Sequence, residues 1–205
     1  GSIEFDDVCF DYGDGVPVLS HVSFTVRPGQ TIGILGSTGA GKSSLVQLLQ
    51  RLYPVTAGRI TLSGVDVNDI ERHHLRRNVG IVLQEPFLYS RTIGENIAIA
   101  RPDADLSDVY AAARTASVHD VIESFSEGYD TVVGERGVTL SGGQKQRVPI
   151  ARMLLQDTPV LIFDDSLSAV DAETDAAIRD ALHSRRHGTM FLISHRIATI
   201  RKSDL

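Results

Sequence analysis

Residues 36–43 read Gly-Ser-Thr-Gly-Ala-Gly-Lys-Ser. They follow the short apolar run 31–35, which is typical of a strand buried on both faces. They lead into residues 42–52, where leucines recur at helical spacing. The glycines let the backbone turn tightly, so that successive N–H groups point at one phosphate chain, and the start of the helix adds the positive end of its dipole. We therefore predict a phosphate-binding loop between a strand and a helix.

With both flanking elements, this stretch matches the P-loop pattern in full. Lys42 supplies a full positive charge for the outer phosphates, and the Ser43 hydroxyl is placed to coordinate Mg²⁺. The alternative interpretation, a chance glycine-rich turn, leaves the flanking strand and helix unexplained. The loop residues expected to bind the nucleotide are Ser37, Thr38, Gly39, Ala40, Gly41, Lys42, Ser43 and Ser44.

A second element completes the pattern. Residues 160–164 form an apolar strand that ends in the carboxylate of Asp164. An aspartate after a buried strand is, taken alone, more often a turn or cap residue. Beside a P-loop, however, such an aspartate typically holds the Mg²⁺ shell together with the loop serine. The two elements together indicate a P-loop nucleoside triphosphatase that uses a nucleotide and Mg²⁺.

Composition limits the alternatives. The chain has 205 residues and a formal net charge of −6, which argues against a nucleic-acid backbone as the main partner. The single Cys9 cannot form an internal disulfide, which fits a reducing compartment. No apolar run approaches the roughly 18–20 residues that span a bilayer. Gly1-Ser2 looks like a cloning remnant, and the final residues 203–205 offer no closing element, so we expect a domain from a longer polypeptide.

Strand and helix patterns alternate along the chain, which implies a parallel sheet covered by helices. Strands are expected at residues 3–10, 18–26, 31–35, 59–62, 79–83, 160–163 and 189–193, and helices at 42–52, 106–116, 118–125, 141–155 and 172–184. We predict an α/β fold with a P-loop NTPase core, a mostly parallel sheet, an N-terminal antiparallel β subdomain and an inserted α-helical subdomain. Residues 3–85 and 156–205 would form the core with the β subdomain, and residues 86–155 the helical subdomain.

Residues 140–144 read Leu-Ser-Gly-Gly-Gln and resemble the signature sequence of ABC ATPases word for word. They stand before the second element at the interval that this family shows, and the resemblance covers residues 3–205. A serine and two glycines that open a helix offer a hydroxyl and free N–H groups to an anion. The resemblance implies head-to-tail pairing of two domains, in which the ATP on one P-loop is also bound by residues of the other domain, Ser141, Gly142, Gly143 and Gln144.

Further positions resemble the family pattern in the right order. Tyr12 lies where an aromatic residue stacks on adenine, and Gln84 resembles the glutamine that reaches Mg²⁺ and senses the membrane domain. His195 resembles the switch histidine that contacts the γ-phosphate. Ser168-Ala169-Val170-Asp171 resembles the loop that crosses to the partner subunit, which implies a trans contact by Asp171. Each residue alone has an ordinary structural interpretation, and their joint order favours the functional one.

Two stretches resemble the exporter branch of the family. Residues 84–90, from Gln84 to Ser90, with Thr92-Ile93 and residues 95–97, look like the surface that receives a coupling helix of a transmembrane domain. Gly134-Glu135-Arg136-Gly137 looks like the exporter cross-talk segment. The alternative is that these apolar residues are core of the helical subdomain. The resemblance implies a location at the cytoplasmic face of a membrane, within a transporter.

Two residues depart from the family pattern. Asp165 stands where most active members carry the glutamate that positions or activates the attacking water. Its side chain is one methylene shorter, which resembles the degenerate site of heterodimeric exporters and implies weak hydrolysis. Pro149 stands inside the expected helix 141–155, where it removes one hydrogen bond and crowds a carbonyl.

Two other functions compete with the exporter motor. A soluble ABC protein of DNA repair or translation usually inserts long coiled coils or basic arms, and the sequence contains neither. A block of apolar helices upstream in the full-length gene would decide between them. A P-loop kinase with a second substrate leaves the signature and His195 unexplained, and a phosphoacceptor assay would test it. The sequence names neither the transported solute nor the partner domain, which could be the same or a different chain.

Overall fold

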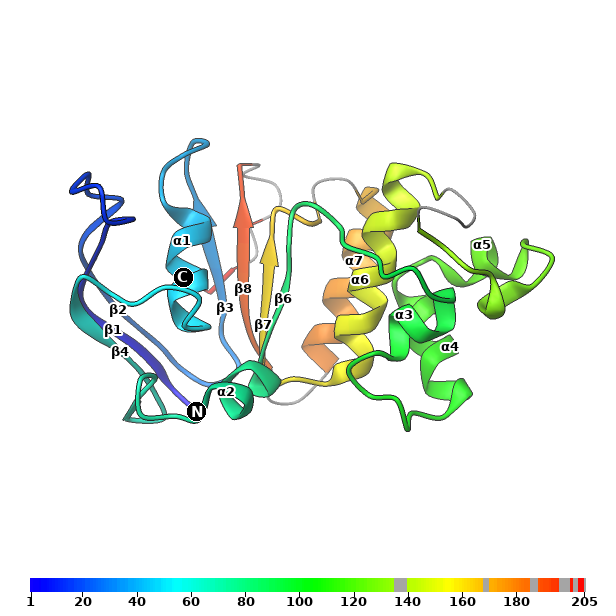
Figure 1. Cartoon of the computed structure of the whole chain (residues 1–205), viewed down its shortest axis with the longest axis horizontal. Helices are drawn as coiled ribbons and strands as arrows, with labels where there is room; N and C mark the ends of the chain where they lie inside the picture. The colour runs from blue at the N-terminus through cyan, green and yellow to red at the C-terminus, as the bar shows by residue number, and fades with distance from the viewer. Residues whose placement is uncertain (135–139, 168–169, 185–187, 196–199, 201–202, 205) are drawn as a thin grey trace. The chain divides into compact units, whose positions relative to one another are not determined.

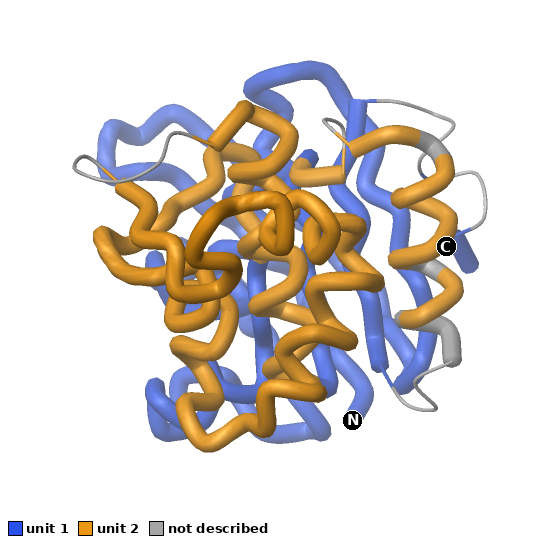
Figure 2. The backbone as a smooth tube through the Cα atoms, turned by 90° about the vertical axis from the view of Figure 1, so that its right-hand side faces the viewer, with its two compact units in different colours: residues 1–81, 158–165, 187–205 blue, residues 82–157, 166–186 orange. Residues whose placement is uncertain are grey.

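The structure is a computed structural model of the chain, and it describes all residues except 135–139, 168–169, 185–187, 196–199, 201–202 and 205. The backbone divides into two compact units, coloured separately in Figure 2. Unit 1 comprises Gly1–Ile81, Thr158–Asp165 and His187–Leu205. Unit 2 comprises Val82–Asp157 and Ser166–Arg186. Each unit is described by itself.

Unit 1 contains an antiparallel sheet with strand order β2-β1-β4-β5, of which Figure 1 labels β1, β2 and β4. Phe5 of β1 lies opposite Phe24 of β2 and Ile60 of β4, and the two phenylalanine rings stack 4.5 Å apart. Alternate residues of β1 are buried, which is the period expected of a strand with one face on the core. The strands are β1 (Ile3–Phe10), β2 (Leu19–Val26), β4 (Ala57–Leu62) and β5 (Val65–Asp66).

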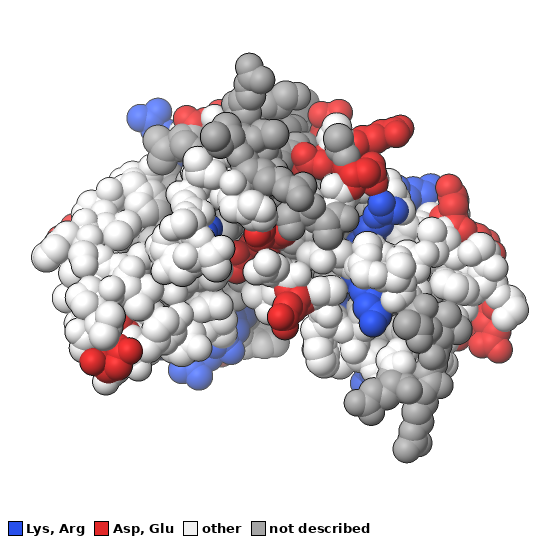
Figure 3. Space-filling view, turned by 90° about the horizontal axis from the view of Figure 1, so that it is seen from above, with Lys and Arg blue, Asp and Glu red and all other residues white. Residues whose placement is uncertain are grey.

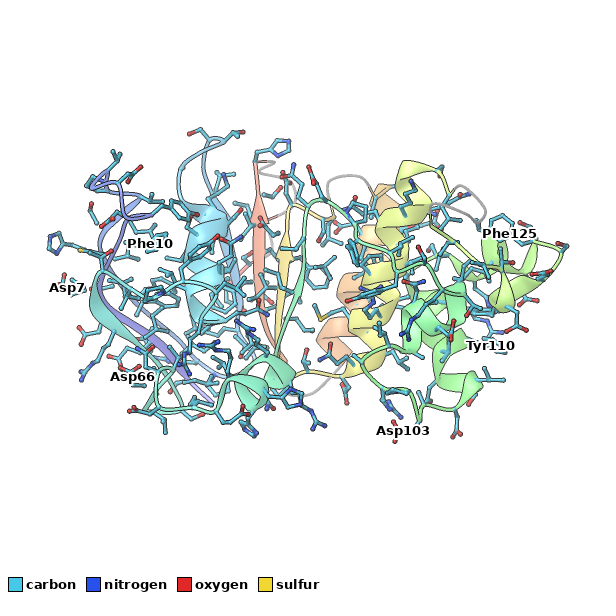
Figure 4. The ribbon with its side chains drawn as sticks, viewed as in Figure 1. Asp7, Phe10, Asp66, Asp103, Tyr110 and Phe125 are labelled. Carbon is cyan, nitrogen blue, oxygen red and sulfur yellow. The ribbon has the colours of Figure 1, made fainter. Side chains whose placement is uncertain are left out.

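Gly58 is required where β4 crosses a register shift in β1. The β1–β4 pairing shifts between Asp6 and Cys9, and Gly58 has a φ of 77° there. A Cβ at position 58 would lie 2.3 Å from the carbonyl oxygen of Asp7, which is backbone and cannot rotate away. Asp7 is labelled in Figure 4. Side chains therefore have no room at this position, and only glycine avoids both the clash and the strained φ.

We expect Gly58→Ala to lower the free energy of unfolding by about 3 kcal/mol, because the left-handed backbone and the clash each cost about 1–2 kcal/mol. Urea denaturation measures the loss. Gly64→Ala is the matched control, since Gly64 has a φ of 79° but no atom of the described part of the chain within 4 Å of the added Cβ. Equal losses in the two variants would mean that the β1–β4 crossing shifts to admit the methyl group.

The second sheet has the strand order β3-β8-β7-β6 (Figure 1). β8 (Thr189–Ser194) pairs in parallel with both β3 (Thr31–Leu35) and β7 (Val160–Asp164), and β6 (Val79–Val82) lies beside β7. Every residue of β7 and β8 is buried, as expected of central parallel strands. The ends of these strands are in register, Leu35 opposite Ser194 and Asp164 opposite Ile193. The segments that follow β3, β7 and β8 therefore emerge at one edge of the sheet. The candidate nucleotide site lies at this edge.

Unit 2 is helical. α6 (Gly142–Gln156) packs against α3 (Ile93–Ala98) and α4 (Leu106–Thr115), and α7 (Ala172–Ser184) packs against α4. The remaining elements are α5 (His119–Glu123) and the short 3₁₀ helix η1 (Gly128–Asp130). Among the residues described, no helix is both long enough and apolar enough to cross a membrane.

The expected α/β class is confirmed, with an antiparallel sheet, a parallel sheet and a helical part. The compact units divide the chain differently from the expected 3–85 and 156–205 against 86–155, because residues 82–85, residues 156–157 and the segment Ser166–Arg186 with α7 all belong to unit 2. The sequence analysis also missed β5, α2 (Arg72–Asn78) and α3. α2 buries only Leu75, so it shows no apolar periodicity, and α3 is too short to show one.

Pro149 lies buried within α6, which continues on both sides of it. We expect Pro149→Ala to raise the melting temperature by about 2–4 °C. The helix regains a hydrogen-bond donor and loses a steric clash, which together stabilise the fold by about 3 kcal/mol. The loss of the contacts of the proline ring and the greater freedom of the unfolded chain reduce this gain by about 2 kcal/mol, and the remainder sets the expected shift. Differential scanning calorimetry measures the shift. An unchanged or lower value would show that the packing around α6 already accommodates the proline.

Candidate nucleotide site

The phosphate loop lies between β3 and α1 (Lys42–Leu49) in unit 1. Its glycines adopt the expected conformations, with φ of 84° at Gly39 and 78° at Gly41. A Cβ at Gly41 would lie 2.8 Å from the carbonyl oxygen of Val18, so the loop also needs glycine to pass this close to the backbone that precedes β2. Lys42 Nζ donates hydrogen bonds to the carbonyl oxygens of Gly36, at 2.8 Å, and Ser37, at 2.7 Å. The ammonium is thereby held at the mouth of the loop.

Asp164, the last residue of β7, lies beside the loop. Its carboxylate is buried and accepts a hydrogen bond from the Ser43 side chain. Burial raises the pKa of Asp164, the Ser43 hydrogen bond opposes this shift, and the nearby Asp165 and Lys42 charges act in opposite directions. A buried carboxylate beside a hydroxyl is a donor set that suits Mg²⁺, which is bound by one or two carboxylates together with phosphate oxygens. Ser43 and Asp164 therefore fit the metal role that the sequence predicts.

Asp165 and His195 form a pair at the same edge of the sheet. Asp165 Oδ2 lies 2.8 Å from Nδ1 of His195, and the backbone N–H of Asp165 donates to the carbonyl oxygen of Ile193. When Asp165 accepts this hydrogen bond from Nδ1, Nε2 is the ring atom left to face a ligand. The Asp165 side chain is 15% exposed and that of His195 is 53% exposed. The pair can thus orient an imidazole toward an anion and offer a carboxylate to a water molecule.

Tyr12 borders an open pocket at the loop, of about 250 Å³. Its hydroxyl lies 2.8 Å from Ser44 Oγ at the start of α1. The ring is 53% exposed, which leaves aromatic surface available for stacking. The pocket is lined by Tyr12, Val18, Gly39, Ala40, Gly41, Lys42, Ser43 and Ser44. An aromatic ring, a row of loop amides and an ammonium therefore line one cavity.

The signature residues lie in unit 2, where Ser141 caps α6. Its hydroxyl accepts from the backbone N–H of Gln144, and the Gln144 side chain accepts from the backbone N–H of Ser141. This reciprocal capping box leaves the N-terminal turn of α6 ordered. Among the described residues, no atom lies within 4 Å of a Cβ built at Gly142, so these residues leave the turn open on that side. The helix end has the free donors and the space that an anion needs.

Gln84 and Asp171 belong to unit 2, whereas the phosphate loop belongs to unit 1. Gln84 is exposed, and its carbonyl oxygen accepts a hydrogen bond from the buried Gln146 of α6. Asp171 accepts from the backbone and side chain of Thr174, which lowers its pKa, and it pairs with Arg147 at 2.6 Å. Within this chain Asp171 therefore caps α7.

The expected coupling surface is held to α6 by polar contacts that the sequence analysis missed. Arg152 donates to the backbone of Asn96 and lies over the ring of Tyr89, 5.6 Å from its centre. The fully buried Asn96 bonds both the N–H and the carbonyl oxygen of Tyr89. Phe87 and Tyr89 form an edge-to-face pair, and Phe87 is 62% exposed. Thr92 followed by Glu95 three residues later is a capping-box pattern, and this pattern in the sequence could have predicted the start of α3.

Two expected segments fall wholly or partly outside the described residues. Of the cross-talk segment only Gly134 is described, and positions 135–137 are not. In the loop 168–171, Ser168 and Ala169 are likewise outside the described residues.

On the face in Figure 3, the described Lys and Arg side chains lie apart among carboxylates and uncharged residues.

This fold and this site define a P-loop nucleoside triphosphatase domain. The chain belongs to the ABC transporter family, because the family model described as ABC transporter matches residues 19–168.

Similar proteins agree with this assignment. The beta-(1→2)glucan export ATP-binding/permease protein NdvA of Rhizobium meliloti (strain 1021) is 48% identical over 100% of this chain and 35% of its own length. NdvA of Brucella suis biovar 1 is 45% identical over 100% of this chain and 34% of its own. A bacterial Atm1-family ABC exporter, solved with ATP bound, is 43% identical with a TM-score of 0.93, over 99% of this chain and 36% of that one. The chain thus spans about a third of the length of the relatives it matches.

Proposed function

We propose that this chain is the ATP-binding and ATP-hydrolysing motor domain of an ABC exporter. The observation that carries the proposal is the pocket in unit 1, where Tyr12 and the loop residues from Gly39 to Ser44 line one cavity. Its relatives include ATP-binding/permease proteins that match the chain over its whole length. The exporter relatives favour the motor over the soluble ABC protein of DNA repair or translation.

ATP binding follows from the chemistry of the cavity. Tyr12 would stack on the adenine, while the loop amides and the Lys42 ammonium would bind the phosphates. Ser43 and Asp164 would hold Mg²⁺, and a bound Mg²⁺ neutralises charge on the phosphate oxygens. Since Lys42 already donates to two loop carbonyls, its ammonium is positioned before the nucleotide arrives.

Hydrolysis would depend on the Asp165–His195 pair. Asp165 would accept a proton from the attacking water, and His195, oriented by Asp165, would hydrogen-bond the terminal phosphate through Nε2. A short carboxylate places the base farther from the phosphate than a glutamate does. We therefore infer weak turnover, as in the degenerate site of a heterodimeric exporter.

A second domain would complete the site. The open N-terminal turn of α6, with Ser141, Gly142, Gly143 and Gln144, would bind the terminal phosphate of an ATP held by the partner domain. Asp171 would contribute across the same interface. Two domains would then close around ATP head to tail, and hydrolysis would release them, because a ligand shared by two chains links their association to its binding.

The membrane partner would dock on the segment from Gln84 to Ser90. Its exposed Phe87 and Tyr89 provide an aromatic surface, and Arg152 and Asn96 fix the backbone beneath it. Such a surface suits an amphipathic helix that inserts apolar side chains. The domain would then lie at the cytoplasmic face of a membrane and drive export of a solute.

The test measures nucleotide binding, association and hydrolysis together. We expect calorimetry to show tight Mg-ATP binding, and light scattering to show a monomer without nucleotide that dimerises weakly with Mg-ATP. Phosphate release should be slow. No ATP binding would overturn the assignment, and a stable dimer without nucleotide would contradict the shared site. Transfer of phosphate to a second substrate would favour a kinase instead.

A further inference from the structure

Three aromatic rings of unit 1 meet beside the nucleotide pocket. Phe10, labelled in Figure 4, is buried at the end of β1, and Tyr12 follows it two residues later. Tyr53 comes from the segment between α1 and β4. The Tyr12 ring packs edge-to-face against Phe10, with centres 4.8 Å apart, and against Tyr53, with centres 5.2 Å apart and an interplanar angle of 89°. Tyr12 is therefore supported by two rings from different parts of the unit.

The backbone around Tyr12 is fixed to the same segment. Asp11 accepts from the Thr56 hydroxyl, and the backbone N–H of Asp11 donates to Thr56 Oγ1. The backbone N–H of Thr56 donates in turn to the carbonyl oxygen of Cys9. The Tyr12 hydroxyl is held at Ser44, as described above. Ring, hydroxyl and backbone are thus each restrained, and residues 53–56 supply two of the restraints.

We propose that Tyr53 is a positioning residue for the adenine site, which holds the Tyr12 ring ready for a flat heterocyclic base. The inference rests on the proposed ATP binding. Tyr53 does not line the nucleotide pocket, so it would act only through Tyr12. An exposed tyrosine that rotates freely must be immobilised when it stacks, and this ordering weakens binding about 3- to 10-fold per side chain. Packing against Tyr53 orders the Tyr12 ring before the nucleotide binds, so this loss of affinity is avoided.

The contacts of Tyr53 distinguish a role at the adenine site from a general effect on the structure of the phosphate loop. Lys42 and the loop amides bind phosphates, and none of the ring contacts of Tyr53 reaches them. Loss of Tyr53 should therefore weaken ligands that carry a base and spare ligands that consist of phosphates alone. Tyr53 is 42% exposed, and its hydroxyl makes no hydrogen bond with the described residues, so a phenylalanine retains every contact that positions Tyr12.

The experiment compares Tyr53→Ala with Tyr53→Phe. Calorimetry gives the affinity for Mg-ATP, and displacement of Mg-ATP gives the affinity for Mg-tripolyphosphate. We expect Tyr53→Ala to weaken ATP binding about 3- to 10-fold, with tripolyphosphate binding unchanged and ATP binding restored in Tyr53→Phe. Circular dichroism verifies that both variants fold.

Two results would overturn the inference. Unchanged ATP affinity in Tyr53→Ala would show that Tyr12 needs no support from this ring. Equal weakening of ATP and tripolyphosphate would show a general disturbance of the loop. Failure of the wild-type chain to bind ATP would refute the proposed function itself, which distinguishes the two failures.

Discussion

Lys42→Ala should weaken Mg-ATP binding by about 100-fold or more, equivalent to about 2.8 kcal/mol. The Lys42 ammonium is the one full positive charge carried by the phosphate loop, and truncation of a charged partner in a site of this kind costs about 2–5 kcal/mol. The variant also removes two donors to the loop carbonyls of Gly36 and Ser37, so the loop itself becomes less ordered. Isothermal titration calorimetry measures the change.

Arg72→Ala is the matched control for that loss of charge. Arg72 is exposed at the start of α2, and its removal changes the net charge by the same amount. We expect ATP affinity in this variant to stay within about twofold, since Arg72 is exposed to solvent, which screens its charge, and does not line the nucleotide pocket. Unchanged affinity in Lys42→Ala, with its melting temperature preserved, would show that the phosphates bind elsewhere.

Much of the fold could be predicted because its strongest signals are local. The apolar runs of β3, β7 and β8 predict strands, and the structure confirms all three; β7 and β8 are buried throughout, whereas β3 is buried only at its start and Leu35 at its end is exposed. α2 and β5 could not be found in this way, since they bury few apolar side chains and depend on neighbours distant in the chain. The place of α7 in unit 2 is likewise a result of tertiary packing, which no local pattern encodes.

The sequence predicted which residues form the site, but their distances and hydrogen bonds depend on the fold and could not be predicted. Parallel neighbours bring the ends of β3, β7 and β8 to one edge, which is why the phosphate loop, Asp164 and His195 meet. The hydrogen bond between Asp165 and His195 joins residues 30 positions apart and has no sequence signal. The support of Tyr12 by Tyr53 was missed for the same reason, because an aromatic residue in a turn segment has many ordinary interpretations.

Asp165 is the residue on which the proposed rate depends. It has a φ of 48°, a left-handed conformation that aspartate tolerates better than most residues. Its carboxylate already reaches His195, so its charge and its orientation are both in place. Under the proposed weak turnover, what it would lack for general base catalysis is reach toward an attacking water, and geometry comes before pKa in judging such a base.

Asp165→Glu should therefore raise kcat about ten- to a hundredfold and leave ATP affinity nearly unchanged. One methylene moves the carboxylate by about 1 Å, and a displacement of that size is worth on the order of 100-fold in rate. Binding should not change, because it depends on Tyr12, the loop and Asp164. The glutamate should cost about 1 kcal/mol of stability, since a longer side chain suits the left-handed backbone less well. Steady-state phosphate release at saturating Mg-ATP measures the rate.

Asp165→Asn is the control that separates reach from charge. The asparagine has nearly the same shape and can still accept from Nδ1 of His195, but it cannot take a proton from water. It should lower an already small rate, while His195 keeps its orientation. Each rate must be divided by the dimer fraction from light scattering, because failure to pair would mask any change in chemistry. If the wild-type chain hydrolyses ATP rapidly and Asp165→Glu changes nothing in a confirmed dimer, then Asp165 suffices as the base, and the site is a fully active one.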